Sequence, residues 1–355
     1  MIRSTVADLQ SLGLRVINRN PNRRGGAGPA EGISILIDDI PVNVPTKAHY
    51  VSKSPYFLRT SNGTNFLFRN KTELFPVSII HEPKFYNITT KDGIKLKKIA
   101  LLHGKDCLAT TVIQKCIYWN TGNRCKFCGI ELSLKNGQTL AVKTPEQLAE
   151  VAKTAKELDD VRHIVMTSGS VRPSFKGIRY ISDCIRAIKQ TVDLPIHVQV
   201  EPPEDPDELE EFKNAGLDTI GLHIETFDFD ILSKIAPVKA MFGLERYEKA
   251  WKKSVDLFGP NQVSTFLIAG LGERWDSLIW GSEYLAGMGV YPFLVPFRPI
   301  PGTVLGEKLP PDPDLMIGLY EQVSEIIKKN DMASEKSKAG CVRCGACSAI
   351  AEFEK

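Results

Sequence analysis

The chain has 355 residues, of which 43% are hydrophobic and 25% are charged, a composition typical of a globular protein with a sizeable core. Its 45 basic and 42 acidic residues leave a formal charge of +3 without a long run of one sign, so charge gives no argument for a nucleic-acid partner. No stretch approaches the ~20 consecutive apolar residues of a membrane span, and the start lacks the apolar segment of a signal peptide, so we expect a cytoplasmic protein without a membrane or nucleic-acid partner.

Residues 1–105 predict a β-rich N-terminal module that follows a short helix near residues 4–14. Residues 21–28 are rich in arginine and glycine and predict a flexible basic loop. Apolar residues alternate with other residues on both sides of Asp38-Asp39, which indicates two strands and a turn, and Asn62-Gly63 is a strong signal for a hairpin. Nothing in this module has the pattern of a catalytic site, so we interpret it as a cap on the main domain.

Residues 106–310 alternate between short apolar runs and helical stretches. Thr144 predicts a helix N-cap, followed by Pro145 at the first helical position and Gln147 in a capping box. The apolar runs that predict strands are residues 108–113, 163–166, 196–200, 219–224, 264–269 and 291–296. Six β/α units in a row indicate an α/β fold, a partial (β/α)6 barrel in which ligands bind at the carboxyl ends of the strands.

Residues 311–355 predict a helix to about Lys329 and then a short polar tail that carries cysteines. The chain has eight cysteines, of which three lie in this tail. The eight are Cys107, Cys116, Cys125, Cys128, Cys184, Cys341, Cys344 and Cys347. A reducing cytosol argues against disulfides, and six of these residues fall in two tight groups that favour metal ligation. Cys184 lies among apolar residues at helical spacing, which predicts a buried core thiol.

The first group follows the first predicted strand of the barrel and comprises Cys116, Cys125 and Cys128, here called the loop cysteines. Their spacing is C-x8-C-x2-C. Three thiolates on a four-iron cluster leave one iron open for an exogenous ligand. A zinc site ordinarily takes four protein ligands and often pairs two Cys-x2-Cys knuckles. Only one such knuckle is present here, so the spacing favours the iron–sulfur cluster.

With these residues the chain resembles the radical S-adenosylmethionine superfamily over about residues 105–310. In that family the cluster binds S-adenosylmethionine and cleaves it to a 5′-deoxyadenosyl radical. The usual spacing there is C-x3-C-x2-C, so the longer first gap is a departure that leaves Cys107 as a substitute for Cys116. Phe127 corresponds to an aromatic residue that shields the cluster and adenine in the family.

The resemblance also implies residues that bind S-adenosylmethionine. Residues 166–170 correspond to the segment that binds the methionyl amino group, and Glu201 corresponds to a polar residue near the ribose, with a solvated loop carboxylate as the alternative. Ile268, Gly270 and Glu273 match the family's G-x-I-x-G-x-x-E segment, where Phe266 replaces the first glycine. The implied cofactor-binding residues are Phe127, Thr167, Ser168, Gly169, Glu201, Ile268, Gly270 and Glu273.

The second group comprises Cys341, Cys344 and Cys347, here called the tail cysteines. Their spacing of C-x2-C-x2-C lets three thiolates converge on a second four-iron cluster, whose fourth position is open to Ser348, Cys107, an exogenous sulfide or substrate. Residues 296–305 resemble a segment of biotin and lipoyl synthases. Within this segment, Arg298 could bind the carboxylate of a ligand or pair with an acidic side chain at a strand end. The whole arrangement is most similar to a subunit of the archaeal-type two-component lipoyl synthase.

That resemblance implies two [4Fe-4S] clusters and S-adenosylmethionine as cofactors. It implies insertion of sulfur from the auxiliary cluster into an unactivated C–H bond of a protein-bound octanoyl group. The implied partners are an octanoylated lipoyl-carrier protein or peptide, a related radical S-adenosylmethionine subunit, and a ferredoxin or flavodoxin electron donor. One alternative is a radical enzyme of another outcome, methylation or dehydrogenation, whose auxiliary cluster relays electrons. The non-enzyme alternatives are an iron–sulfur electron carrier and a zinc-stabilised binding module.

Overall fold

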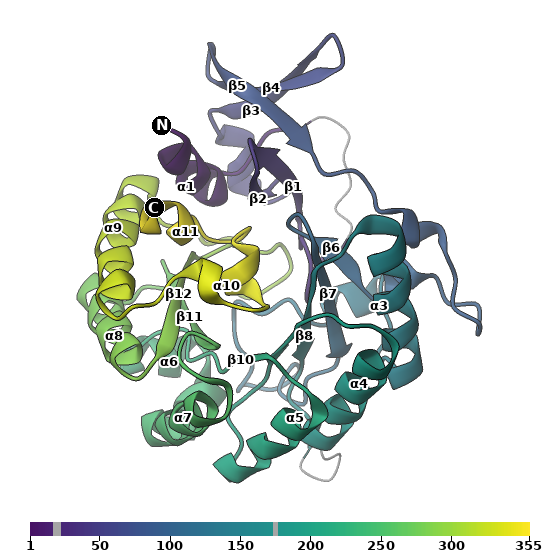
Figure 1. Cartoon of the computed structure of the whole chain (residues 1–355). Helices are drawn as coiled ribbons and strands as arrows, with labels where there is room; N and C mark the ends of the chain where they lie inside the picture. Colours follow the sequence, from purple (N-terminus) through teal and green to yellow (C-terminus); the bar gives the residue numbers. More distant parts are fainter. Residues whose placement is uncertain (17–22, 173–176) are drawn as a thin grey trace.

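The computed structural model describes residues 1–16, 23–172 and 177–355 and contains two β-sheets (Figure 1). The smaller sheet has five strands in the order β2-β1-β5-β4-β3, and the larger has seven in the order β12-β11-β10-β9-β8-β7-β6. Helices cover the outer side of the larger, curled sheet (Figure 1). This arrangement confirms the predicted α/β fold with a partial barrel and a β-rich N-terminal segment.

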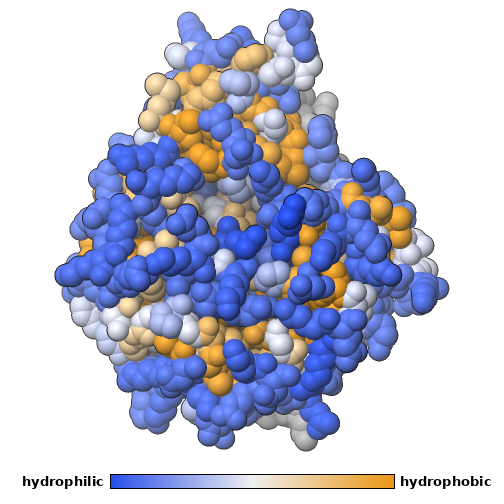
Figure 2. Space-filling model, in the orientation of Figure 1, coloured by the Kyte–Doolittle hydropathy of each residue, from blue (hydrophilic) through white to orange (hydrophobic). Residues whose placement is uncertain are grey.

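The smaller sheet is antiparallel and lies in the N-terminal part of the chain. Asn62 and Gly63 both adopt positive φ, at 49° and 79°, as a two-residue hairpin turn requires, and Asp38 does the same at 52°. The elements of this part are α1 (Ile2–Leu12), β1 (Gly32–Ile37), β2 (Ile40–Pro45), β3 (Tyr56–Ser61), β4 (Thr64–Arg69) and β5 (Thr72–Ile79). Figure 2 shows apolar side chains gathered over this part of a mostly hydrophilic face.

The larger sheet contains the six predicted parallel strands. These are β7 (Cys107–Ile113), β8 (His163–Ser168), β9 (Ile196–Gln199), β10 (Thr219–Gly221), β11 (Val263–Ala269) and β12 (Val290–Pro296). Every residue of β7 and β12 is buried, as expected for parallel strands covered on both faces. A further strand, β6 (Leu101–His103), pairs antiparallel with β7, so the barrel sheet begins before residue 106.

The helices begin and end where the sequence carries cap signals. Thr144 and Gln147 form the predicted capping box at the start of one helix. Gly216, at φ 93°, ends another. The helices after the N-terminal module are α2 (Leu132–Lys135), α3 (Pro145–Asp159), α4 (Gly177–Thr191), α5 (Glu210–Ala215), α6 (Phe229–Ile235), α7 (Pro237–Phe258), α8 (Trp275–Gly287), α9 (Pro313–Lys329), α10 (Cys341–Cys344) and α11 (Ile350–Glu354). Within the described ranges no helix has the length and apolar composition needed to cross a membrane.

One hydrophobic core joins the two sheets, and the C-terminal tail packs between them. The backbone carbonyl of Ala346 accepts hydrogen bonds from the Asn43 N–H on β2, at 2.7 Å, and from the Gln10 side chain on α1, at 3.1 Å. Cys184 on α4 is fully buried in this core, as predicted. The tail is therefore held by residues far from it in the sequence.

The predicted flexible basic loop is wrong for residues 23–28, whereas Pro21 and Asn22 lie outside the described residues. Arg23 is fully buried, and its guanidinium donates to the carbonyls of Ala27 and Lys97 at 3.3 and 3.2 Å. Burial lowers the pKa of Arg23 to about 10. Backbone carbonyls accept from both terminal nitrogens of this buried guanidinium, which offsets part of the cost of burying it, whereas its Nε–H has no partner among the described residues.

Candidate active site

The loop cysteines lie beyond the carboxyl end of β7. The Cys116 thiol lies 3.5 Å from the hydroxyl of Ser170, which follows β8, and the Cys128 N–H donates to the Cys125 carbonyl at 3.1 Å. Burial raises the pKa of Cys128 to about 11, so an electropositive centre is needed to hold this sulfur as thiolate. Cys116 and Cys128 pack against an apolar cluster of Trp119, Ile130 and Leu132. Three thiols on one loop fit a four-iron cluster that keeps one iron open.

The tail cysteines lie close to the opposite, amino end of β7. His103 on β6 has its Nδ1 3.3 Å from the Cys344 sulfur and its Nε2 3.4 Å from the Cys347 sulfur. Gln199 donates to the Cys341 sulfur at 3.1 Å. Burial alone would raise the pKa of Cys347, but the His103 imidazole lowers it below its usual range. The imidazole thus favours thiolate, the form that binds metals.

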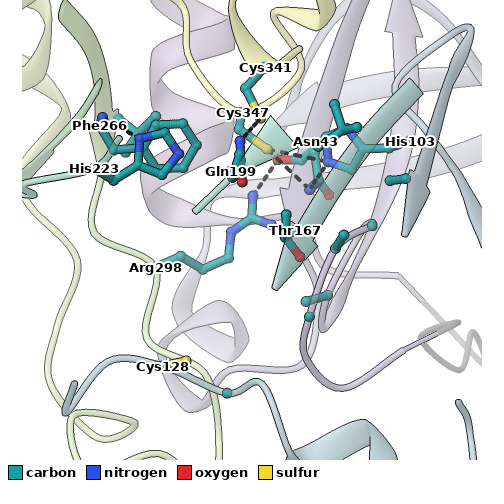
Figure 3. A pocket seen from close by; sticks show the side chains of 18 of the residues that line it. Asn43, His103, Cys128, Thr167, Gln199, His223, Phe266, Arg298, Cys341 and Cys347 are labelled. Carbon is teal, nitrogen blue, oxygen red and sulfur yellow. Dashed lines mark hydrogen bonds between the residues drawn. The ribbon is translucent and has the colours of Figure 1, made fainter. Parts of the chain in front are cut away.

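A cavity of about 410 Å³ connects the two cysteine groups. Cys128 and Phe127 line one part of it, and all three tail cysteines line another. Figure 3 shows Arg298 between Cys128 on one side and Cys341 and Cys347 on the other. A molecule that fills the cavity would therefore contact both groups.

The described residues include no three His, Cys, Asp or Glu side chains arranged to hold a single metal ion. A four-iron cluster is bound by cysteine sulfurs on separate irons, so its ligands need not converge on one point.

Four of the residues predicted to bind S-adenosylmethionine line this cavity: Phe127, Thr167, Ser168 and Ile268. Glu201 is half-buried and its carboxylate accepts a hydrogen bond from Ser170 at 2.6 Å. Burial raises the pKa of Glu201. Glu201 is therefore a half-buried, hydrogen-bonded carboxylate and not a freely solvated one. The hydrogen-bonded chain Cys116–Ser170–Glu201 instead connects the loop cysteines to the end of β9.

The remaining three predicted residues shape the backbone near the cavity but do not line it. A Cβ atom on Gly169 would lie 2.1 Å from the Lys115 carbonyl oxygen, so glycine lets the end of β8 approach the cysteine loop. The Glu273 carboxylate accepts hydrogen bonds from the N–H groups of Gly270 and Gly272, at 2.7 and 2.9 Å. Glu273 therefore organises the loop that follows β11.

His223 and Phe266 are two cavity residues that the sequence did not predict as site residues. Phe266 was noted only as the residue that replaces the first glycine of the family motif. Their rings stack with centroids 4.1 Å apart, and both line the cavity. The Phe266 N–H donates to His223 Nδ1 at 3.1 Å, and burial lowers the pKa of His223 well below its usual value. The neutral ring therefore carries its proton on Nε2, which is buried and has no partner among the described residues.

The N-terminal module contributes to the cavity, so its interpretation as a cap alone is wrong. Asn43 on β2 lines the cavity, and its amide nitrogen lies 3.6 Å from the Cys347 sulfur and 3.3 Å from His103 Nε2. Arg298 donates to the Asn43 carbonyl at 2.5 Å. From the sequence, its expected partner was either the carboxylate of a ligand or an acidic side chain at a strand end. A polar residue in an alternating strand ordinarily faces solvent, so no sequence signal distinguished Asn43.

Two of the alternatives for cysteine ligation disagree with the structure. Cys107 begins β7 and lies at the end opposite the loop cysteines, so it cannot replace Cys116. Ser348 donates to the Leu294 carbonyl at 2.5 Å and does not line the cavity. Ser348 is therefore directed away from the tail cysteines.

Comparison with known proteins gives one family. Residues 122–279 match the family model of the Radical SAM superfamily. The chain is 27% identical over 231 residues to bacteriochlorophyllide c C-7(1)-hydroxylase of Chlorobaculum limnaeum, a match over 59% of this chain and 57% of that protein. The chain thus spans little more than half the length of this curated relative.

Two solved structures are among those to which this chain is similar. Methylornithine synthase has a TM-score of 0.48 at 15% identity, over 75% of this chain and 78% of that chain. A radical SAM methyltransferase from Sphaerobacter thermophilus has a TM-score of 0.47 at 14% identity, over 84% of this chain and 81% of that chain. The matched segment contains Cys125 and Cys128 of the cysteine loop and the strands β8 to β11. Residues 122–279 of this chain thus resemble the Radical SAM superfamily, a likeness that implies a [4Fe-4S] cluster and S-adenosylmethionine.

Proposed function

We propose that this chain is a radical S-adenosylmethionine enzyme that inserts sulfur into an unactivated C–H bond. In this proposal the loop cysteines hold the cluster that binds S-adenosylmethionine, and the tail cysteines hold a second, auxiliary [4Fe-4S] cluster. When bound, these groups would supply hydrogen abstraction and the sulfur that replaces the hydrogen. The supporting observation is that Cys128 of the loop cysteines and all three tail cysteines line one cavity. An electron relay needs no contact with substrate, whereas a sulfur donor must touch the carbon that it modifies.

The chain's own residues would bind and orient the reactants in this cavity. Thr167 and Ser168 present polar groups at the carboxyl end of β8, where ligands bind in barrels of this kind. Phe127 lies beside Cys128 and would exclude water from the neighbouring iron centre. The His223 Nε2–H has no partner among the described residues, which suits an acceptor such as a carbonyl group of the substrate.

The proposed substrate is a protein-bound octanoyl group, as in lipoyl synthesis. An alkyl chain suits the apolar side chains of the cavity wall, which include Ala30, Ala109, Val165, Val295, Phe297 and Ile300. Three of these belong to β12 and the segment after it, which resembles biotin and lipoyl synthases. The proposed partners are an octanoylated carrier protein or peptide, a related radical S-adenosylmethionine subunit, and a ferredoxin or flavodoxin that donates electrons.

A second candidate is a radical reaction without sulfur insertion, in which the tail cysteines hold an electron relay. The relative from Chlorobaculum limnaeum favours it, because that protein is named as a hydroxylase. Methylation and dehydrogenation belong to the same alternative.

The decisive experiment is anaerobic incubation of the enzyme with S-adenosylmethionine, a reductant and an octanoylated lipoyl-domain peptide, followed by mass spectrometry. Sulfur insertion predicts a peptide in which sulfur replaces hydrogen, with auxiliary sulfide lost in step with product. The matched variant replaces Cys341, Cys344 and Cys347 by alanine. It should still form 5′-deoxyadenosine, because the loop cysteines are intact, but it should form no C–S bond.

The electron-relay alternative predicts the opposite result. Many turnovers with a sulfur-free product and undiminished auxiliary sulfide would reject sulfur insertion and leave the second candidate.

A further inference from the structure

A fourth cysteine lies with the tail cysteines at the amino end of β7. Cys107 is 1% exposed and packs against Cys344 in a small buried cluster with Val165 and Ala346. Cys107 also lines the cavity beside the three tail cysteines. Four thiols, from two segments more than 200 residues apart, thus meet at one end of the cavity.

The turn before Cys107 is shaped to receive the tail. Gly104 has a φ of 59°, and a Cβ atom there would lie 2.7 Å from the Cys344 sulfur. Glycine therefore permits both the left-handed turn and the close approach of Cys344 to the β6–β7 hairpin. A side chain at position 104 would push Cys344 away from Cys107.

The other polar groups around these sulfurs are placed as hydrogen-bond partners. His103 lies between Cys344 and Cys347 with one ring nitrogen near each sulfur. Gln199 donates to Cys341, and the Asn43 amide lies beside Cys347. Such donors to cysteine sulfurs typically tune iron–sulfur clusters rather than ligate them. The hydrogen bonds from His103, Gln199 and Asn43 to sulfur all go to tail cysteines and none to Cys107, the fourth thiol at this end of the cavity.

We propose that Cys107 is the fourth ligand of the auxiliary cluster, which would then have a complete set of four cysteines. The inference rests on the second cluster of the proposed function and deepens it. Four cysteine thiolates are the usual ligand set of a [4Fe-4S] cluster. With every iron ligated by the protein, the cluster would present sulfide atoms, not an open iron, to a substrate in the cavity.

The test uses a full-length background variant in which Cys116, Cys125 and Cys128 are alanine, so that only the auxiliary cluster can form. After anaerobic reconstitution this variant should hold about four irons and four sulfides per chain. Adding Cys107→Ala should leave one iron without a protein ligand. Mild oxidation should then lower the content to about three irons per chain and produce the EPR signal of a three-iron cluster. Cys107→Ser should retain about four irons with a changed EPR spectrum of the reduced cluster.

Cys184→Ala is the matched control, because Cys184 is an equally buried cysteine on α4 and does not line the cavity. It should leave iron content and EPR spectrum unchanged. The proposal is overturned if Cys107→Ala behaves like this control under oxidation. A background variant that binds no iron would overturn the auxiliary cluster as well, whereas an intact four-cysteine cluster with a sulfur-free product would reject only sulfur insertion.

Discussion

Glu273 holds the loop after β11 through two backbone N–H groups, those of Gly270 and Gly272. Both glycines have positive φ, at 102° and 119°, a conformation that few other residues adopt. The loop begins directly after Ile268 and Ala269 at the end of β11, and Ile268 lines the cavity. Glu273 is therefore a positioning residue for the cavity wall rather than a residue that contacts a ligand.

Glu273→Ala should weaken S-adenosylmethionine binding about tenfold, equivalent to ~1.4 kcal/mol, while the iron content of both proposed clusters stays unchanged. The substitution leaves two N–H groups without their carboxylate acceptor, and each such hydrogen bond contributes ~1.5–3 kcal/mol. Calorimetric titration with S-adenosylmethionine, together with iron analysis, measures the effect. Glu273→Gln is the control and should recover part of the affinity, because the amide oxygen can still accept one of the two bonds. An affinity equal to that of the unaltered protein would contradict this role.

At the scale of elements, the tail meets β9 closely where Gly340 lies against His197. Gly340 has a φ of 98°, and a Cβ atom on it would lie 2.6 Å from the imidazole ring of His197. His197 is 2% exposed, and Thr219 on β10 lies 2.7 Å from its Nδ1. The ring therefore has no room to move, and the tail approaches the barrel only because residue 340 is glycine.

Gly340→Ala should displace the tail and remove the iron of the proposed auxiliary cluster, about four atoms per chain, without affecting the loop cysteines. Iron and sulfide analysis of the reconstituted variant measures the loss. Gly345→Ala is the control, because Gly345 also has positive φ, at 65°, but a Cβ atom there would meet nothing within 4 Å. The control should cost only the ~1–2 kcal/mol of left-handed backbone strain. Full auxiliary iron in Gly340→Ala would show that the tail tolerates the contact.

At the scale of the whole molecule, three distant parts of the chain meet around the tail cysteines. The smaller sheet contributes Asn43, the β6–β7 hairpin contributes His103 and Cys107, and the end of β9 contributes Gln199. Arg298, after β12, joins the barrel to the smaller sheet through the Asn43 carbonyl. The N-terminal module is thus part of the same cavity as the barrel.

Asn43→Ala should weaken iron binding at the tail cysteines by about 10–100-fold, a typical effect of removing an outer-shell partner of a metal ligand. The amide beside Cys347 and His103 is lost, whereas no cysteine changes. Competition with an iron chelator in the background that lacks the loop cysteines measures the effect. Asn65→Ala on β4 is the control, because Asn65 lies in the same sheet but bonds Thr60. Equal iron retention in the two variants would exclude Asn43 from the auxiliary site.

The sequence alone determined the features that depend on neighbouring residues. Continuous apolar runs marked the six parallel strands, because strands buried on both faces show no alternation. Thr144 with Gln147, and Asn62 with Gly63, marked a helix start and a hairpin, because caps and turns are set by local backbone geometry. The loop cysteines were also visible, because their thiols lie within one loop.

Only the tertiary structure decided which residues share the cavity. The sequence left Cys107 as a possible ligand with either the loop cysteines or the tail cysteines. Its position at the amino end of β7 places it beside the tail cysteines only. Arg23 was predicted to lie in a flexible loop and Asn43 carried no signal, because a loop or strand pattern records which positions are polar but not what covers them. His103 and Cys344 are 241 residues apart, and contacts of that separation arise from the packing of two sheets around one core, which no local pattern in the sequence encodes.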